Sequence, residues 1–376
     1  MGKKKLRVFE AFAGIGAQSI ALSRLNIDYE IVGISEWFID AISCYDILNC
    51  DQSQKIEIPS YEEQMEYLKN FTFSKDSVKP TDLNGTRKSI IERLYVTNKR
   101  TKNFGSILEI NGNDLPPFDL LVYSFPCQDL SIGGNHEGMK KGSGTRSGLL
   151  WEIERILLEL NEKNALPEFL VMENVTNITN KRHIDDLNQW LDFLESLGYA
   201  NDDCMKLNAL SFGIPQNRDR AFIVSHLGEK LNTPSKLVIK KKPYKISDFI
   251  KTDYSNPIYK AEADEAQLRK TPFREKMWKI NGKEINEDTI LQTITCNMDR
   301  AHCAGMFLYN GVLGDSYRRP TIREAFLLMG FTNEEYEKTK SLNYSYRKMN
   351  KLIGNSIVID VLQEVFRAML EGSDYL

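Results

Sequence analysis

The sequence predicts an α/β protein with a doubly wound, mostly parallel sheet and a second, smaller domain. Apolar runs at residues 6–9, 29–34 and 118–122 each lead into a polar or glycine-containing turn, as buried parallel strands do. A further apolar run begins at Phe169. After Gly228 the composition changes to Pro, Lys and short strand-like pieces, which indicates the second domain.

A glycine turn follows the first strand and precedes a helical pattern at residues 20–22. The turn consists of Phe12, Ala13, Gly14, Ile15 and Gly16. Glycines let a ligand approach the backbone, and a helix start offers free N–H groups. Glu36 follows the second strand about twenty residues later, where nucleotide-binding folds place an acid on ribose hydroxyls. This spacing favours a nucleoside cofactor over a purely structural loop.

One cysteine stands at the end of a probable buried strand. The run Tyr123 to Ser131 contains Pro126, Cys127 and Gln128. A cysteine after an apolar strand is more often an inert buried thiol. A thiol in a proline-turned loop is, however, open to a ligand on one side, as a nucleophile requires.

Two further clusters carry charged side chains at strand ends. Glu173 ends an apolar run, which would put it at the carboxyl edge of a parallel sheet, where such folds bind ligands. Arg218 and Arg220 precede the strand-like run 221–225 at alternating positions, so both are expected on one face of an extended segment. Taken alone, the arginines could equally be a solvated strand edge.

Together these clusters resemble the DNA (cytosine-5)-methyltransferase family, in order along the chain. The matching segments are Phe12-Ala13-Gly14-Ile15-Gly16, Pro126-Cys127-Gln128, Glu173-Asn174-Val175, Gln216-x-Arg218-x-Arg220, Arg323-Glu324-Ala325 with Leu328-Met329-Gly330-Phe331, and Gly354-Asn355-Ser356. Residues 51–102 and about 228–319 lack such matches. The stretch 124–155 is similar to bacterial restriction-modification methylases, among them ones acting at CG and at GATC sites.

The resemblance implies a covalent mechanism. Cys127 would add as thiolate to carbon 6 of cytosine, which makes carbon 5 nucleophilic toward a methyl sulfonium. Glu173 would stabilise the ring at N3 and the exocyclic amine, and Arg220 would contact O2. Arg218 would support the loop. Because a base inside a duplex is inaccessible, the cytosine must be flipped out.

The resemblance also implies S-adenosylmethionine as methyl donor, with S-adenosylhomocysteine as product. The resemblance assigns Phe12, Gly14 and Gly16 to the methionine end, Asn355 and Ser356 to the amino-acid tail, Glu36 to the ribose, and Trp37 and Ser106 to the adenine. The expected cofactor-binding residues also include Ala13, Ile15, Ile107, Pro126 and Leu149. The family usually has Gly-Asp-Ile where this chain has Gly105-Ser106-Ile107, so either the Ser106 hydroxyl or a water molecule would replace the carboxylate that receives the adenine amine.

Double-stranded DNA is the implied partner. The glycine- and lysine-containing segment 131–146 fits a mobile lid that closes over DNA, although a surface loop has the same composition. The expected DNA contacts are Gln128, Ser131, Lys140, Lys141, Arg146, Gln216 and Thr295. The net charge of −3 does not exclude DNA binding, because a cationic cleft can lie on an acidic body.

We expect three functional segments. Residues 1–227 form a catalytic domain with an insertion at about 51–102, helical around Tyr61 to Lys69 and without an evident catalytic role. Residues 228–335 form a target-recognition domain, in which Thr293-Ile294-Thr295-Cys296 resembles a short DNA-contacting element. Residues 336–376 return to complete the catalytic domain, with a helix from Ile353 to Ala368.

Composition completes the set of expectations. Six Cys without regular pairing and no long apolar span favour a cytoplasmic protein with reduced thiols. The resemblance to the methylase family implies an intracellular enzyme encoded by a bacterium or a phage. The four His and the Cys spacing predict no metal site. A monomer is expected, with a cognate restriction endonuclease as one partner. Two alternatives stay open, namely a tRNA cytosine-5 methyltransferase and a non-catalytic DNA-binding regulator.

Overall fold

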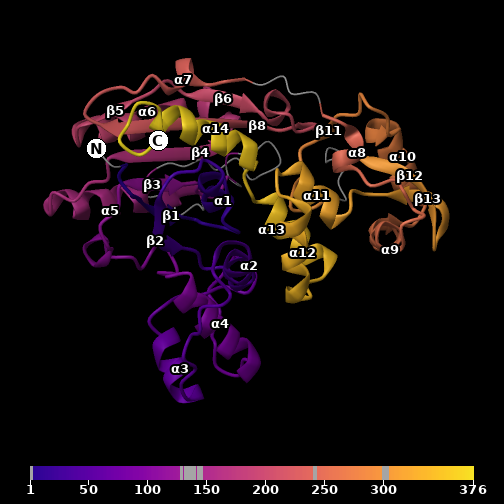
Figure 1. Cartoon of the computed structure of the whole chain (residues 1–376), viewed down its shortest axis with the longest axis horizontal. Coiled ribbons are helices and arrows are strands. Elements are labelled where there is room, and N and C mark those ends of the chain that lie inside the picture. Colours follow the sequence, from indigo (N-terminus) through magenta and orange to yellow (C-terminus); the bar gives the residue numbers. More distant parts are fainter. Residues whose placement is uncertain (1–2, 128–129, 131–140, 142–146, 240–243, 299–304) are drawn as a thin grey trace. The chain divides into compact units, whose positions relative to one another are not determined.

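The computed structural model describes residues 3–127, 130, 141, 147–239, 244–298 and 305–376. The chain folds into two compact units (Figure 1). Unit 1 comprises Met1–Leu207, Asp219–Val238 and Gln363–Leu376, and unit 2 comprises Asn208–Arg218 and Ile239–Leu362. These units divide the chain at other residues than the three functional segments expected above, which therefore stay a prediction.

Unit 1 is built on a sheet with the strand order β2-β1-β3-β4-β8-β5, and β6 pairs with β8. Its strands are β1 (Leu6–Ala11), β2 (Tyr29–Ser35), β3 (Leu120–Tyr123), β4 (Phe169–Val175), β5 (Tyr199–Asn201), β6 (Met205–Asn208) and β8 (Asp219–Leu227). The four strands β2, β1, β3 and β4 are mutually parallel, whereas β8 runs antiparallel to β4 and β5. This confirms the predicted α/β class with a mostly parallel sheet.

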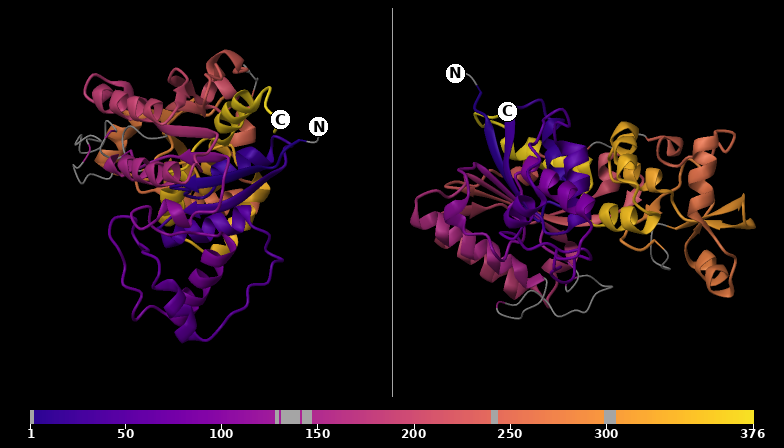
Figure 2. Two further views of the ribbon diagram at one scale, coloured as in Figure 1. Left: turned by 90° about the vertical axis from the view of Figure 1, so that its left-hand side faces the viewer. Right: turned by 90° about the horizontal axis from the view of Figure 1, so that it is seen from below.

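Both faces of this sheet are buried, as the continuous apolar strands predict. On one face Phe9, Leu121 and Leu170 lie side by side in register and pack against the helices α5 (Leu150–Glu162) and α6 (Ile184–Ser196). The alternating residues, such as Val8 and Val122, point to the other face and are equally buried. Figure 2 shows helices on both sides of the sheet.

Four more helices of unit 1 follow the first strands or close the unit. They are α1 (Ala17–Ser23), α2 (Ile39–Asn49), α7 (Thr233–Lys236) and α14 (Ile359–Leu370), whose first residues belong to unit 2. The side-chain amide of Gln363 on α14 donates to the backbone carbonyl of Arg24, which follows α1. The C-terminal helix is thereby joined to the N-terminal part of the chain.

The 51–102 insertion forms its own small layer beside α2. It holds α3 (Tyr61–Leu68), as predicted, and α4 (Lys88–Arg100), and both helices extend away from the sheet in Figure 1. Ser60 and Glu63 form a capping box that starts α3. Buried side chains of α3 and α4 meet those of α2 in a separate apolar cluster, made of Ile39, Ile42, Leu68, Phe73, Ile91, Leu94 and Tyr95.

Unit 2 combines short helices with small sheets. Its helices are α8 (Ile246–Phe249), α9 (Pro257–Ala266), α10 (Pro272–Asn281), α11 (Ile322–Leu328), α12 (Asn333–Thr339) and α13 (Tyr346–Gly354). Its strands are β7 (Gln216–Asn217), β9 (Gln267–Leu268), β10 (Gly282–Lys283), β11 (Leu291–Gln292), β12 (Met306–Gly311) and β13 (Gly314–Arg318). One sheet has the order β10-β12-β13-β9, and β11 pairs with β7.

The predicted helix from Ile353 to Ala368 is confirmed from Ile359 onward, whereas its first residues are not part of it. The chain forms α13 up to Gly354 and begins α14 at Ile359, with a break between them. A Cβ on Gly354 would lie 2.3 Å from the backbone carbon of Thr295, so this position packs directly on another segment of unit 2. That tertiary contact, which apolar periodicity does not reveal, holds the break in place.

Candidate functional site

The glycine turn after β1 takes a backbone conformation that glycine permits and other residues adopt with strain. Gly14 has φ +58° and Gly16 has φ +80°, and Phe12 is also left-handed at φ 57°. A Cβ on Gly16 would meet the side chains of Asn49 and Tyr45, so that glycine permits close packing on α2. A Cβ on Gly14 would meet nothing within 4 Å. The turn therefore has open space beside Gly14.

Glu36 borders the same turn. Its Oε2 accepts a hydrogen bond from the Gly14 N–H at 2.9 Å, and its Oε1 accepts one from the Phe38 N–H at 2.7 Å. Burial raises the pKa of this half-buried carboxyl to about 7, although these backbone donors favour its ionised form. The structure thus brings the predicted ribose acid and the predicted glycine turn together.

The residues expected at the adenine lie on the two segments next to Glu36. Trp37 is partly buried, and its backbone carbonyl accepts from the Ser74 N–H at 2.7 Å. Ser106 and Ile107 are buried, and the Ser106 hydroxyl accepts from the Leu108 N–H at 3.4 Å. Both segments belong to unit 1 and flank the insertion.

The loop that carries Cys127 is fixed at several backbone atoms. The Asn174 amide donates to the carbonyl of Phe125 at 3.1 Å, and the Ser147 hydroxyl donates to the carbonyl of Pro126 at 2.7 Å. The Leu130 N–H donates to the carbonyl of Cys127. Cys127 itself is partly exposed and forms no disulfide with a described cysteine. A thiol held by backbone yet open on one side meets the structural requirement for a nucleophile.

Glu173 lies beside this loop and is almost fully buried. Its Oε2 accepts from the Ser124 hydroxyl at 2.5 Å, and its Oε1 lies 3.1 Å from Nε of Arg220. The contact with Arg220 follows from the strand register. Arg220 lies on β8, the antiparallel neighbour of β4, and pairs there with Val175 of β4, so its side chain points to the same face as Glu173. The carboxylate, a cation and a hydroxyl thus meet at the carboxyl ends of β3 and β4.

Five other predicted residues lie in unit 2. Gln216 is fully buried, and its side chain bonds to the carbonyl of Leu328 and the N–H of Ile294. The Arg218 guanidinium donates to the carbonyls of Ile294 and Ser356, each at 2.7 Å. Thr295 is partly exposed, Asn355 is exposed and Ser356 is buried. The two arginines therefore contact different segments, since Arg220 bonds within unit 1.

Six further predicted residues lie in or near the segment 128–149, and the structure describes only two of them, Lys141 and Leu149. Gln128, Ser131, Lys140 and Arg146 lie outside the described residues, as does most of the predicted lid. Lys141 forms an ion pair with Glu154 at 2.6 Å, and Leu149 is partly buried just before α5. Nothing tests their predicted roles.

Sequence reasoning missed the groups that hold the predicted residues in place. Ser124 and Asn174 lie in the sequence segments that contain Cys127 and Glu173, but the sequence predicted no function for either residue. Their position offers a signal, because β3 and β4 are neighbouring parallel strands whose carboxyl ends meet at one edge. Asn98 and Asn103, which bond around Glu36, carried no pattern that could have been recognised.

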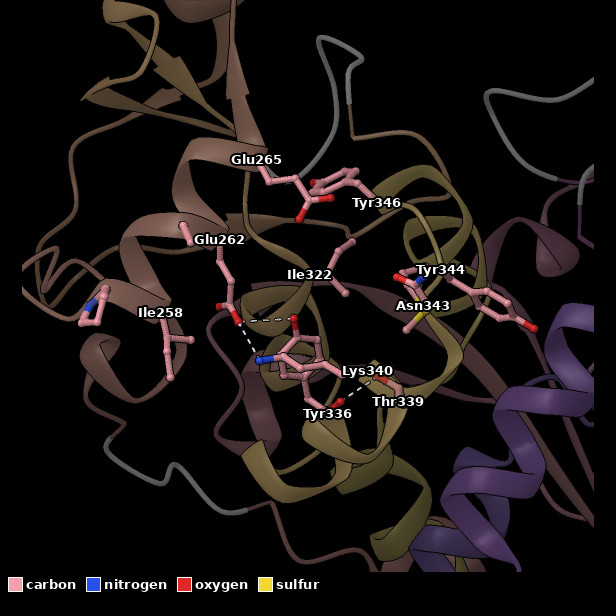
Figure 3. A pocket seen from close by; sticks show the side chains of 13 residues that line it. Ile258, Glu262, Glu265, Ile322, Tyr336, Thr339, Lys340, Asn343, Tyr344 and Tyr346 are labelled. Atoms are coloured by element: carbon pink, nitrogen blue, oxygen red, sulfur yellow. Dashed lines mark hydrogen bonds and ion pairs between the residues drawn. The ribbon is translucent and has the colours of Figure 1, made fainter.

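One cavity of about 490 Å³ lies within unit 2, and Figure 3 shows its lining. Glu262 there pairs with Arg323 and Lys340 and accepts from the Tyr336 hydroxyl. None of the predicted site residues within the described ranges lines this cavity. The catalytic prediction therefore does not involve it.

Among the described residues, no group of three or more His, Cys, Asp or Glu side chains could hold a metal ion. No helix in the described part of the chain is long and apolar enough to cross a membrane.

Comparison with known families names the class of protein. The C-5 cytosine-specific DNA methylase family matches residues 69–371, which is most of the chain. The protein belongs to this family and is a DNA cytosine methyltransferase.

Two relatives match nearly full length. The chain is 37% identical to the orphan methyltransferase M.SssI of Spiroplasma monobiae, over 96% of both proteins. It is 34% identical to the type II methyltransferase M2.ScrFI of Lactococcus lactis subsp. cremoris, covering 98% of this chain and 99% of that protein. These similarities confirm the predicted kinship with bacterial restriction-modification methylases.

Solved structures support the fold. The Dnmt2 methyltransferase of S. pombe matches with a TM-score of 0.62 at 19% identity, covering 98% of this chain and 99% of that one. The methyltransferase EhMeth of Entamoeba histolytica matches with a TM-score of 0.60 at 13% identity. At such identities the likeness concerns the fold alone.

Proposed function

We propose that this enzyme transfers a methyl group from S-adenosylmethionine to carbon 5 of a flipped-out cytosine in duplex DNA, through a covalent adduct with Cys127. The observation that carries the proposal is that the Cys127 loop, Glu173 and Arg220 lie together at the carboxyl ends of β3 and β4 in unit 1. A nucleophile, an acid and a cation are the groups that attack on a pyrimidine ring requires.

In this mechanism the Cys127 thiolate adds to carbon 6 of the ring, and the electron pair of the C5–C6 bond moves toward N3 and O2. Glu173 in its protonated form donates to N3 and accepts from the exocyclic amine, while Arg220 donates to O2. Carbon 5 then attacks the methyl carbon, and the bond from that carbon to the sulfonium sulfur breaks, which leaves S-adenosylhomocysteine. A base removes the proton from carbon 5, and the thiolate leaves from carbon 6.

The two contacts of Glu173 prepare it for this role. The Ser124 hydroxyl and the Arg220 guanidinium together satisfy both carboxyl oxygens before a base arrives. A buried carboxylate without such donors would carry a large desolvation cost. Ser124 and Arg220 thus fix the position of the Glu173 carboxyl at the strand ends.

The methyl donor fits the glycine turn. The open space at Gly14 and the carboxylate of Glu36 lie side by side, and ribose hydroxyls would donate to that carboxylate. S-adenosylmethionine supplies the electrophilic methyl carbon. Phe12, Trp37, Ser106, Asn355 and Ser356 are assigned to its remaining parts by the family resemblance.

The domain roles follow the same resemblance. We assign target recognition to residues 228–335, with Thr295 at the DNA backbone and Gln216 and Arg218 holding its segment through Ile294. The name of the Lactococcus relative, a type II methyltransferase, supports a cognate endonuclease as partner. The Spiroplasma relative is named an orphan methyltransferase, which supports action without one.

Replacement of the nucleophile tests the proposal. We expect Cys127→Ser to lower the rate of methyl transfer by more than about a thousandfold, because a serine hydroxyl stays protonated. DNA affinity, measured by gel shift, is expected to stay within about threefold, since catalysis and binding are separate terms. Cys204→Ser is the matched control, because Cys204 is also partly buried but has no part in the proposed mechanism. Retained turnover in Cys127→Ser would remove Cys127 from the mechanism.

A further inference from the structure

The insertion at residues 51–102 contacts the segment that carries Glu36. β2 is the edge strand of the sheet, so its outer side has no neighbouring strand to hold the residues that follow it. The chain just after the insertion covers this side. Asn103 forms a parallel bridge with Ile34, and the Phe104 N–H donates to the Ile34 carbonyl.

The Asn103 side chain forms hydrogen bonds with both the backbone N–H and the backbone carbonyl of Glu36. Its Oδ1 accepts from the Glu36 N–H at 2.9 Å, and its Nδ2 donates to the Glu36 carbonyl at 2.9 Å. A backbone N–H can only donate and a carbonyl can only accept, so this pairing fixes which end of the amide is oxygen. Asn103 thereby acts as a substitute for the missing neighbouring strand.

The insertion in turn fixes Asn103. Its Nδ2 also donates to Oδ1 of Asn98 on α4 at 2.7 Å. The Asn98 Nδ2 donates to the Tyr67 hydroxyl of α3 at 3.1 Å and to the Asn103 carbonyl at 3.3 Å. Asn98 is 0% exposed and Asn103 is 3% exposed. A chain of buried and partly buried hydrogen bonds thus runs from both insertion helices to the backbone of Glu36.

The same layer fixes the neighbours of Glu36. The Ser74 N–H donates to the Trp37 carbonyl, and the Ile39 N–H donates to the Ser74 carbonyl, so the chain after Glu36 is held by the insertion as well. A Cβ on Gly105 would lie 3.1 Å from Cβ of Phe71 in the insertion. Both segments expected at the adenine therefore touch this layer.

We propose that the insertion is a brace that positions Glu36 for the ribose of the methyl donor through Asn98 and Asn103. This inference rests on the proposed function, because it assigns the ribose to Glu36. Asn98, Asn103 and Tyr67 are positioning residues that act through Glu36 and do not touch the ligand. The brace sets affinity for the ribose hydroxyls of the donor, and leaves chemistry at Cys127 unchanged.

Binding of two ligands to Asn98→Leu tests the brace. Leu keeps much of the volume of Asn98 but cannot hold Asn103, so we expect affinity for S-adenosylhomocysteine to fall about tenfold. The 2′,3′-dideoxy form of that ligand lacks the hydroxyls that Glu36 would bind. We therefore expect Asn98→Leu to bind this form with an affinity within about twofold of that of the wild-type protein, a difference no larger than independent sites usually show. Isothermal titration calorimetry gives both values.

A milder pair of variants guards against misfolding of Asn98→Leu. Tyr67→Phe removes only the hydroxyl at the outer end of the network, and we expect about a threefold loss of affinity for S-adenosylhomocysteine. Tyr95→Phe is the matched control, because Tyr95 packs edge-on against Tyr67 in the same layer and its hydroxyl has no hydrogen bond to another described residue. Tyr95→Phe is expected to bind like wild type.

Steady-state kinetics separates positioning from general damage. For Asn98→Leu and Tyr67→Phe we expect a higher KM for S-adenosylmethionine with unchanged kcat and unchanged KM for DNA. Equal loss of affinity for both ligands, or no loss for either, in an active enzyme would overturn the brace alone. A wild-type protein that binds neither ligand and transfers no methyl group would overturn the proposed function and the brace together.

Discussion

Glu36 illustrates how one residue combines several constraints. Its backbone is held by Asn103 and its carboxyl oxygens by the N–H groups of Gly14 and Phe38. Burial raises its pKa to about 7, whereas two ribose hydroxyls would add donors that favour the ionised form. Ligand binding and ionisation of this carboxyl are therefore coupled.

This coupling predicts a pH-dependent affinity. Because the ligand favours ionised Glu36, binding below pH 7 must remove a proton from this carboxyl. Affinity for S-adenosylhomocysteine should therefore fall by up to about tenfold for each unit by which the pH is lowered below about 7. Above about pH 7 the affinity should become level in this respect. Calorimetry between pH 5.5 and 8.5, given as wild type relative to Glu36→Gln, isolates the effect of this carboxyl. An identical pH profile for both proteins would contradict the coupling.

At this scale the sequence predicted residues with a distinctive neighbourhood and missed those without one. Glu36 was identifiable because it follows a strand at a fixed distance from the glycines. Asn103 lies 67 positions from Glu36, across an insertion with no recognisable pattern. Ser124 was quoted beside Cys127, but its bond to Glu173 depends on strand order, which a sequence does not state directly.

Among the elements of unit 2, α11 depends on one buried ion pair. Arg318 at the end of β13 makes two hydrogen bonds to the Glu324 carboxylate, and both side chains are 0% exposed. Glu324 also accepts from the Thr321 and Lys251 N–H groups. The carboxylate therefore caps α11 and joins it to β13 and to the end of α8.

Loss of the negative charge should be costly. Glu324→Gln leaves the buried Arg318 guanidinium without its counter-ion, and we expect a loss of about 3–5 kcal/mol in the free energy of unfolding. Glu371→Gln breaks the more exposed pair with Arg367 and should cost less than about 1 kcal/mol. Urea unfolding compares the two. A similar small effect for both variants would show that the buried pair does not stabilise unit 2.

Element boundaries show where pattern reasoning stops. The apolar run that begins at Phe169 and ends at Glu173 lies within β4, because a strand buried on both faces is apolar over most of its length. The helix expected across Gly354 is broken, because a contact with Thr295 decides the conformation there. Apolar periodicity describes one element at a time and carries no information on such contacts.

On the scale of the whole molecule, the class of fold was predictable and the fold of unit 2 was not. Long apolar strands and a glycine turn define a doubly wound sheet, whereas unit 2 contains strands as short as β7 and β9, of two residues each. Two-residue strands have no periodicity to detect. The placement of Asn208–Arg218 in unit 2 likewise depends on tertiary contacts of Gln216 and Arg218.

The proposed mechanism depends on cytosine in DNA as the substrate. Its most direct test is transfer of a labelled methyl group from S-adenosylmethionine to unmethylated genomic DNA and, in parallel, to tRNA, followed by base-resolution conversion sequencing. We expect label in DNA alone, with methylated cytosines that share one short motif. Label confined to tRNA, or label in neither nucleic acid, would contradict DNA as the substrate.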